Sequence, residues 1–190
     1  MGKTVAEINQ ETEYITSFDM RPEDTEVYMK YISPLFQGSI VIDFGTGQAK
    51  NVIRMALCAP QVQIWTWDWG QGGESIPHTY FREITRRLKK HHVENVYFTI
   101  AESNSAWPTW DLPIDILNID AAHDYETTLN DLIRWGHFVK SGGYIFIHDY
   151  EYKGHDGYKF EGMRKAVQEY CVTGFEFIEY LGGTQVIKKL

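Results

Sequence analysis

Cysteine is scarce in this chain of 190 residues, which contains only Cys58 and Cys171. Both fall in segments with a helical pattern and lack the spacing of a metal site, so we expect reduced thiols packed inside a cytoplasmic protein. The apolar runs have the length of strands, and the N-terminus lacks the apolar stretch of a secretory signal. These absences argue against a disulfide scaffold, a membrane partner and a secreted protein.

Basic residues are also in the minority, with 18 Lys and Arg against 26 Asp and Glu and a net charge of −8. An acidic chain is poorly suited to a broad nucleic-acid surface, so we expect small-molecule chemistry and no nucleic-acid partner. The hydrophobic content of 43% is enough for a chain of this length to bury the core of one domain.

The chain does contain a glycine-rich turn between a strand pattern and a helix pattern. An apolar, β-branched run ends at Asp43, and Gly45 and Gly47 follow it. Glycines at such a turn let the backbone approach a ligand, and the unpaired N–H groups of the helix start favour an electron-rich group. The next strand pattern ends in Asp68, where nucleotide-binding α/β folds place the acid that binds ribose hydroxyls.

The glycine spacing discriminates between nucleotides. A dinucleotide fingerprint would need glycine at position 50, which is Lys50. The pattern acid-x-G-x-G-x-G fits at Asp43, Gly45 and Gly47, with Ala49 in place of the last glycine. It resembles motif I of the class I S-adenosylmethionine-dependent methyltransferases. An ordinary strand-to-helix turn without a ligand would also explain these glycines.

Strand and helix patterns alternate along the chain. Strands are expected at 40–42, 62–67, 96–100, 114–119, 144–147, 175–180 and 184–188, and helices at 21–38, 51–59, 76–91, 125–138 and 160–171. We expect residues 1–20 to form an arm or lid, 68–75 a glycine-rich loop, and 140–143 the end of a helix. A proline-rich loop after residue 106 would abbreviate one crossover.

The last two expected strands are separated only by residues 181–183, which forces an antiparallel hairpin. The whole pattern predicts an α/β fold, a Rossmann-like doubly wound sheet of seven strands that is mostly parallel, with an antiparallel strand from the C-terminal hairpin. We expect an N-terminal arm and helix at residues 1–38 and a single globular domain at residues 39–190.

Acidic residues end five of the expected strands, where a pure scaffold would need none. They are Asp43, Asp68, Glu102, Asp120 and Asp149. Ligands of open α/β sheets bind at the carboxyl ends of the strands, and carboxylates gathered there repel one another unless a positive or hydrogen-bonding group lies among them. The competing explanation is that each acid caps the following helix, which applies best to Asp68 and Glu102.

Two further motifs make the resemblance specific. Residues 120–125 have the pattern D-x-x-H-x-Y, and a glycine pair at 142–143 precedes the strand that ends at Asp149. With motif I and the terminal hairpin, these motifs resemble the class I family that includes the metal-dependent sugar and macrolide O-methyltransferases and the cephalosporin-type enzymes. The resemblance covers about residues 39–188, so it implies that residues 39–190 form the S-adenosylmethionine-binding domain.

The resemblance implies S-adenosyl-L-methionine as the cofactor. The turn that begins at Asp43 would line the methionine part, Asp68 would bind the ribose hydroxyls, and Glu102 with Ser103 would face the adenine. The implied cofactor-binding residues are Asp43, Phe44, Gly45, Thr46, Gly47, Asp68, Trp69, Glu102, Ser103 and Asp120.

The resemblance also implies a divalent metal held by Asp120, Asp149 and a neighbour of Asp149. That neighbour is usually an acid or an asparagine in the relatives, whereas this chain has His148 and Tyr150. Histidine can ligate a metal, but Mg²⁺ prefers oxygen. The implied ligands Asp120, His148 and Asp149 therefore leave three alternatives, which are fewer protein ligands with more water, a softer divalent ion, or an empty site.

His123 is the expected catalytic base, acting with Asp120 and Asp149. An imidazole that titrates near neutrality suits removal of a proton from a hydroxyl group whose pKa a neighbouring cation has lowered. The expected reaction is O-methylation of a small-molecule hydroxyl, by in-line attack of the substrate oxygen on the sulfonium methyl group. A structural histidine bonded to Asp120 or Asp124 is the alternative.

Two other functions stay open on the sequence. A nicotinamide-dependent oxidoreductase would share the fold, although the third glycine and any Y-x-x-x-K pair are missing. A non-catalytic binding protein of the methyltransferase fold would also be consistent with Ala49 and His148. The acceptor is not evident, and the N-terminal arm would complete an open pocket or reach another protomer of a homo-oligomer.

Overall fold

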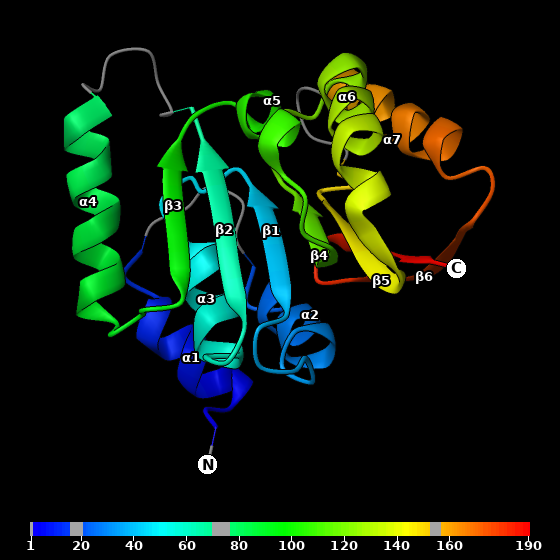
Figure 1. Cartoon of the computed structure of the whole chain (residues 1–190). Helices are drawn as coiled ribbons and strands as arrows, with labels where there is room; N and C mark the ends of the chain where they lie inside the picture. Colours follow the sequence, from blue (N-terminus) through cyan, green and yellow to red (C-terminus); the bar gives the residue numbers. More distant parts are fainter. Residues whose placement is uncertain (1, 16–20, 70–76, 153–156) are drawn as a thin grey trace.

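The computed structural model describes residues 2–15, 21–69, 77–152 and 157–190. These residues form a seven-stranded sheet in the order β3-β2-β1-β4-β5-β7-β6 (Figure 1). The strands are β1 (Ile40–Phe44), β2 (Gln63–Asp68), β3 (Val96–Ile100), β4 (Ile114–Ile119), β5 (Val139–His148), β6 (Phe175–Leu181) and β7 (Thr184–Lys189). Strands β1 to β5 are parallel, and β7 runs antiparallel between β5 and β6. The predicted Rossmann-like sheet with its antiparallel hairpin is confirmed.

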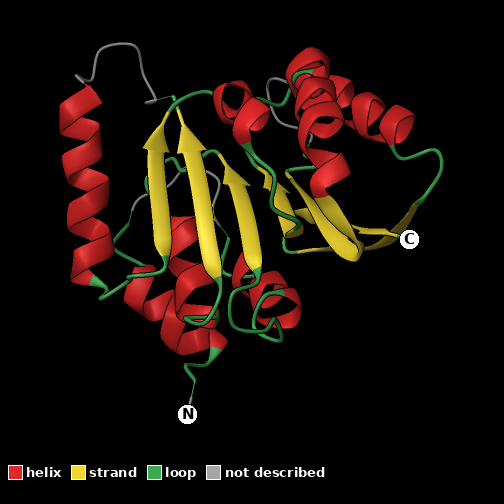
Figure 2. Cartoon of the chain, in the orientation of Figure 1, coloured by secondary structure: helices red, strands yellow, loops and turns green. Residues whose placement is uncertain are grey.

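Helices cover both faces of the sheet (Figures 1 and 2). They are α1 (Val5–Thr12), α2 (Asp24–Tyr31), α3 (Lys50–Cys58), α4 (Pro77–Lys90), α5 (Ser103–Ala106), α6 (Tyr125–Trp135) and α7 (Gly157–Tyr170), with the 3-10 helices η1 (Trp107–Thr109) and η2 (Gly136–Phe138). Helices α2, α3 and α4 pack on one face, and α6 and α7 pack on the other. The sheet is therefore buried on both sides.

Successive residues of the central strands point to opposite faces. Val41 and Ile116 pack on the side of α3, whereas Ile42 and Leu117 pack on the side of α6, and all four side chains are fully buried. Burial on both sides explains why these strands are continuous apolar runs. Each such side chain contributes roughly 1.5–3 kcal/mol when it leaves water. The same residues that predict the strands therefore hold the layers together.

The N-terminal segment contains a helix that the sequence does not predict. Helix α1 is capped by Thr4, whose side chain accepts the backbone N–H of Glu7, while the Glu7 side chain accepts from the Thr4 backbone. Nε of Arg54, in α3, donates to Oγ1 of Thr12 over 3.0 Å. A helix of eight residues is marginal by itself and too short to show a clear period. Its packing against α3 explains why the segment is helical.

Strand β5 begins earlier than the sequence pattern indicates. It starts at Val139, so Gly142 and Gly143 lie inside the strand, and the expectation that they close the preceding helix is wrong. At Gly143, a Cβ would come within 2.8 Å of the backbone oxygen of Asp115, where the pairing of β4 with β5 is irregular. Glycine is needed here because two strands approach closely. A glycine pair after a helical pattern is also typical of a helix end, which explains the wrong prediction.

The crossover between β3 and β4 is short, as predicted, and contains α5 and η1. Helix α2 is shorter than the helix expected at 21–38. Residues 16–20 of the expected arm and 70–75 of the expected glycine-rich loop lie outside the described residues. Within the described ranges, no helix is both long and apolar enough to cross a membrane.

Candidate active site

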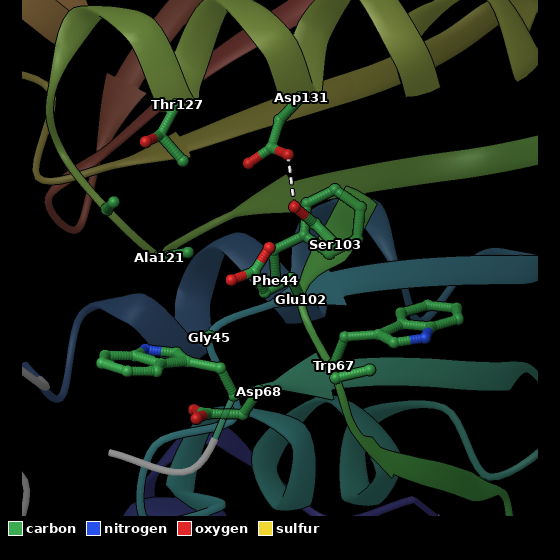
Figure 3. A pocket seen from close by; sticks show the side chains of 12 residues that line it. Phe44, Gly45, Trp67, Asp68, Glu102, Ser103, Ala121, Thr127 and Asp131 are labelled. Atoms are coloured by element: carbon green, nitrogen blue, oxygen red, sulfur yellow. Dashed lines mark hydrogen bonds between the residues drawn. The ribbon is translucent and has the colours of Figure 1, made fainter. Parts of the chain in front are cut away.

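A cavity of about 410 Å³ lies at the carboxyl ends of β1 to β4, beside the first turns of α6 (Figure 3). Open α/β sheets bind their ligands at this edge. The lining residues are Phe44, Gly45, Trp67, Asp68, Trp69, Ala101, Glu102, Ser103, Ala121, Ala122, Thr127 and Asp131. Among the predicted cofactor residues, Phe44, Gly45, Asp68, Trp69, Glu102 and Ser103 line the cavity, whereas Asp43, Thr46, Gly47 and Asp120 are not among its lining residues.

Gly45 lets the ends of β1 and β4 approach closely. Its φ is 98°, and a Cβ at this position would lie 1.9 Å from the backbone oxygen of Asp120. Hydrogen bonds fix the surrounding backbone, from the N–H of Gly45 to the oxygen of Trp67 over 3.0 Å and from the N–H of Asp120 to the oxygen of Phe44 over 2.9 Å. The glycine in this turn therefore has a steric cause in addition to its place in the cavity wall.

Asp68 ties the glycine turn to the end of β2. Its Oδ2 accepts the backbone N–H of Gly47 over 2.8 Å, and its carboxylate lines the cavity beside Gly45 (Figure 3). A carboxylate in this position can accept hydrogen bonds from a diol. This is where the sequence places the group that binds ribose hydroxyls.

Asp43 lies beneath the turn and is fully buried. Its Oδ2 accepts the hydroxyl of Thr66, and its Oδ1 accepts the side-chain amide of Asn118, each over 2.7 Å. Thr66 also bonds to the hydroxyl of Thr46. Burial raises the pKa of Asp43 to about 7, although the hydrogen bonds from Thr66 and Asn118 act in the opposite direction and lower it. The acid of motif I thus supports the turn from below.

The cavity wall formed by Trp67, Ser103 and Asp131 packs on a cluster of aromatic rings. Trp67 packs against Trp135 with ring centroids 5.4 Å apart, and Nε1 of Trp135 donates to the backbone oxygen of Ser103 over 3.1 Å. The hydroxyl of Ser103 donates to Oδ1 of Asp131 over 2.5 Å. These bonds fasten the segment of Glu102 and Ser103 to α6 and hold it against the cavity.

A second group of polar side chains lies beside the cavity, where β4 and β5 end. Nδ1 of His148 is 3.1 Å from Oδ1 of Asp120 and 3.5 Å from Oδ2 of Asp149. Nε2 of His123 is 4.0 Å and 3.9 Å from the same two oxygens, and its ring packs on Phe160. The structure therefore brings together all four residues that the sequence assigns to catalysis or to a metal.

Three residues of this group are missed by the sequence analysis. Oδ1 of Asp24, in α2, lies 3.5 Å from Nε2 of His148. The hydroxyl of Tyr28 donates to Oδ1 of Asn51 over 2.6 Å, and Nδ2 of Asn51 donates to Oδ2 of Asp120 over 2.8 Å. Asp24 and Tyr28 are four residues apart on one helix face, which is the only signal of their proximity in the sequence.

Three carboxylates surround the ring of His148 and shift its pKa. Burial alone would lower the pKa of His148, but the charge of Asp120 and the nearby carboxylates of Asp149 and Asp24 raise it well above its ordinary value. A ring protonated at both nitrogens has no lone pair for a metal. Across the part of the chain that the structure describes, no group of three or more His, Cys, Asp or Glu side chains is arranged to hold a metal ion. A proton on each nitrogen of His148 would therefore supply a positive charge among these carboxylates.

The strand order, the glycine turn and the acid at the end of β2 define the class I methyltransferase fold. The family model described as "Methyltransferase domain" matches residues 3–150, a range that includes α1 and α2. The chain belongs to this family and is an S-adenosylmethionine-dependent methyltransferase. No curated protein is similar enough to this chain to count as a relative.

Several solved structures share the fold at low sequence identity. Cofactor-bound Rv0187 from MTB has a TM-score of 0.74 and 15% identity, with 97% of this chain and 87% of that chain covered. The O-methyltransferase NovP has a TM-score of 0.68 and 19% identity, with coverage of 87% and 78%. An rRNA methylase from Streptococcus thermophilus has a TM-score of 0.64 and 16% identity, with coverage of 86% and 95%. At these identities the similarity shows the fold alone.

Proposed function

We propose that this methyltransferase transfers a methyl group to the hydroxyl oxygen of a small molecule, with His123 as the base. The position of His123 carries the proposal. It follows Ala121 and Ala122 of the cavity wall, and its Nε2 lies within 4.0 Å of the carboxylates of Asp120 and Asp149. The O-methyltransferase NovP, which has the same fold, supports oxygen as the acceptor atom.

S-adenosylmethionine, when bound, supplies an electrophilic methyl group on a positively charged sulfur. The residues of the cavity fit such a molecule. Gly45 contributes backbone to the cavity wall, Asp68 presents a carboxylate to a ribose diol, and Glu102 and Ser103 border the part of the cavity that remains for the adenine. Asp43 would act on the methionine part only through the turn that it supports.

Methyl transfer to a hydroxyl group requires that the oxygen lose its proton. Nε2 of His123 accepts this proton while the oxygen–carbon bond forms and the sulfur–carbon bond breaks, so the products are a methyl ether and S-adenosylhomocysteine. Asp120 and Asp149 stabilise the imidazolium that results, because each presents an oxygen about 4 Å from Nε2. The remaining acceleration comes from alignment and the exclusion of water.

The charge distribution favours a small-molecule acceptor, although an rRNA methylase shares the fold. The net charge of −8 opposes the binding of a polyanion. The basic last turn of α4 is partly neutralised, since Arg86 and Arg87 both donate to Glu83 over 2.8 Å and 2.9 Å. This turn therefore offers less positive charge to phosphate groups than the sequence indicates.

The proposal is tested by methyl transfer from labelled S-adenosylmethionine to a panel of small-molecule alcohols, sugars and phenols, with structured RNA as the competing substrate. The His123→Asn variant should lose roughly 10²- to 10⁴-fold in kcat while it keeps its affinity for S-adenosylhomocysteine. His137→Asn is the matched control, because His137 is exposed on η2, where its ring makes a weak bond to a backbone oxygen and packs on Phe138 away from the cavity lining. Transfer to RNA alone, or full activity of His123→Asn, would contradict the proposal.

A further inference from the structure

Asp131 is a buried carboxylate in the wall of the cavity with one oxygen unpaired. It is 1% exposed. Its Oδ1 accepts the hydroxyl of Ser103, and its Oδ2 is buried without a hydrogen-bond partner. Figure 3 shows the carboxylate directed from α6 toward the cavity, on the side opposite Asp68.

An unpaired, buried carboxylate oxygen is unfavourable unless a donor reaches it when the ligand binds. Ser103 cannot serve both oxygens, because a hydroxyl has a single proton to donate and Ser103 gives it to Oδ1. Because Asp131 lines the cavity, a ligand bound there can supply the missing donor. With the ribose hydroxyls at Asp68, the part of an adenosyl group left for this side is the base, whose exocyclic amine is its hydrogen-bond donor.

We infer that Oδ2 of Asp131 accepts a hydrogen bond from the exocyclic amine of the cofactor's adenine and so selects adenine over a base that carries a carbonyl there. The inference deepens the proposed function and depends on its cofactor. Ser103 is a positioning residue in this arrangement, because its hydroxyl fixes one carboxylate oxygen and thereby aims the other. Trp135 fixes Ser103 in turn through its backbone oxygen.

Glu102 is the competing acid, since it lines the same cavity and the sequence places it near the adenine. Its side chain differs from Asp131 in two respects. It belongs to an exposed residue, so water can satisfy its oxygens, whereas Asp131 is enclosed and held by Ser103. A buried, oriented acceptor discriminates between donor and acceptor groups on a ligand far better than a solvated one.

The test compares S-adenosylhomocysteine with S-inosylhomocysteine, in which a carbonyl replaces the amine, by titration calorimetry. The wild type should prefer the adenine compound by at least about tenfold. Asp131→Asn keeps the shape and can still accept from Ser103, but its amide donates to a carbonyl. The variant should bind S-adenosylhomocysteine about tenfold more weakly and lose or invert the preference. Glu102→Gln, the matched control, should keep the wild-type preference.

Each other outcome contradicts the inference in an identifiable way. An unchanged preference in Asp131→Asn, or a preference lost in Glu102→Gln instead, overturns the role of Asp131 and leaves the methyltransferase function intact. If the wild type binds neither compound, the proposed function fails together with the inference. Thermal unfolding of each variant checks that a change in binding does not come from loss of the fold.

Discussion

Nε2 of His148 lies 3.5 Å from Oδ1 of Asp24, and both side chains are almost completely buried. Asp24 begins α2, and His148 ends β5, so this contact joins the N-terminal helices to the far side of the site. Together with Asp120 and Asp149, Asp24 surrounds the ring with carboxylates. The N-terminal segment therefore contributes one of the acidic side chains around His148.

Replacing His148 by asparagine should lower the free energy of unfolding by about 3–5 kcal/mol, because it leaves buried carboxylates without their positive partner. Denaturant unfolding measures the loss. The double variant Asp24→Asn/His148→Asn should recover part of it, since one of the repelling charges is removed. Additive effects of the two changes would show that the pair does not interact.

The raised pKa of His148 also predicts how the protein responds to metals. Calorimetric titration of the wild type with Mg²⁺ or Mn²⁺ should show no stoichiometric binding, and EDTA should leave methyl transfer unchanged. His148→Asp is the matched variant, because it supplies a third carboxylate beside Asp120 and Asp149 and should bind Mn²⁺. Stoichiometric binding of either ion by the wild type would contradict the assignment of charge to His148.

The buried carboxyl of Asp43 predicts a pH dependence of stability. Its pKa in the folded state is raised to about 7, above the value of the unfolded chain. The folded state therefore holds the proton more tightly, so the contribution of Asp43 to stability is fully present below about pH 4 and is lost as pH rises through about pH 7.

Asp43→Asn, which resembles the protonated form, should remove this dependence. The difference in unfolding free energy between variant and wild type should change in favour of the variant by up to ~1.4 kcal/mol per pH unit over that window. Urea unfolding from pH 4 to pH 8 provides the measurement. Parallel stability curves for the two proteins would mean that Asp43 is ionised throughout.

Gly45 should not tolerate a side chain. In Gly45→Ala the new Cβ would lie 1.9 Å from the backbone oxygen of Asp120, so the ends of β1 and β4 must separate. We expect loss of S-adenosylhomocysteine binding and a stability loss of more than ~3 kcal/mol.

Gly142→Ala is the control for Gly45→Ala. Gly142 also has a positive φ, of 81°, but no atom lies within 4 Å of its ideal Cβ position. Its variant should lose only about 1–2 kcal/mol from backbone strain and should bind the cofactor normally. Equal losses in the two variants, measured by denaturation and calorimetry, would show that the conformation of Gly45 matters and its close approach does not.

The amino-acid sequence alone determined the sheet and the position of the cavity. Both follow from local patterns: buried apolar runs predict the strands, Gly45 marks the turn, and Asp68 and Asp120 lie at strand ends that must share one edge of a parallel sheet. The class of cofactor was implied by the resemblance of the motifs to a methyltransferase family. Period and spacing along the chain are enough for such predictions.

Only the tertiary structure decided which direction each acid faces and what surrounds it. Asp43 and Asp68 end neighbouring strands, yet the first is enclosed beneath the turn and the second lines the cavity. The electrostatic interaction of His148 with Asp24 and Asp120 depends on the distances between α2, β4 and β5, and these distances cannot be predicted from the sequence. Side-chain direction and long-range electrostatics arise when the layers pack, because burial changes both the neighbours and the proton affinity of each group.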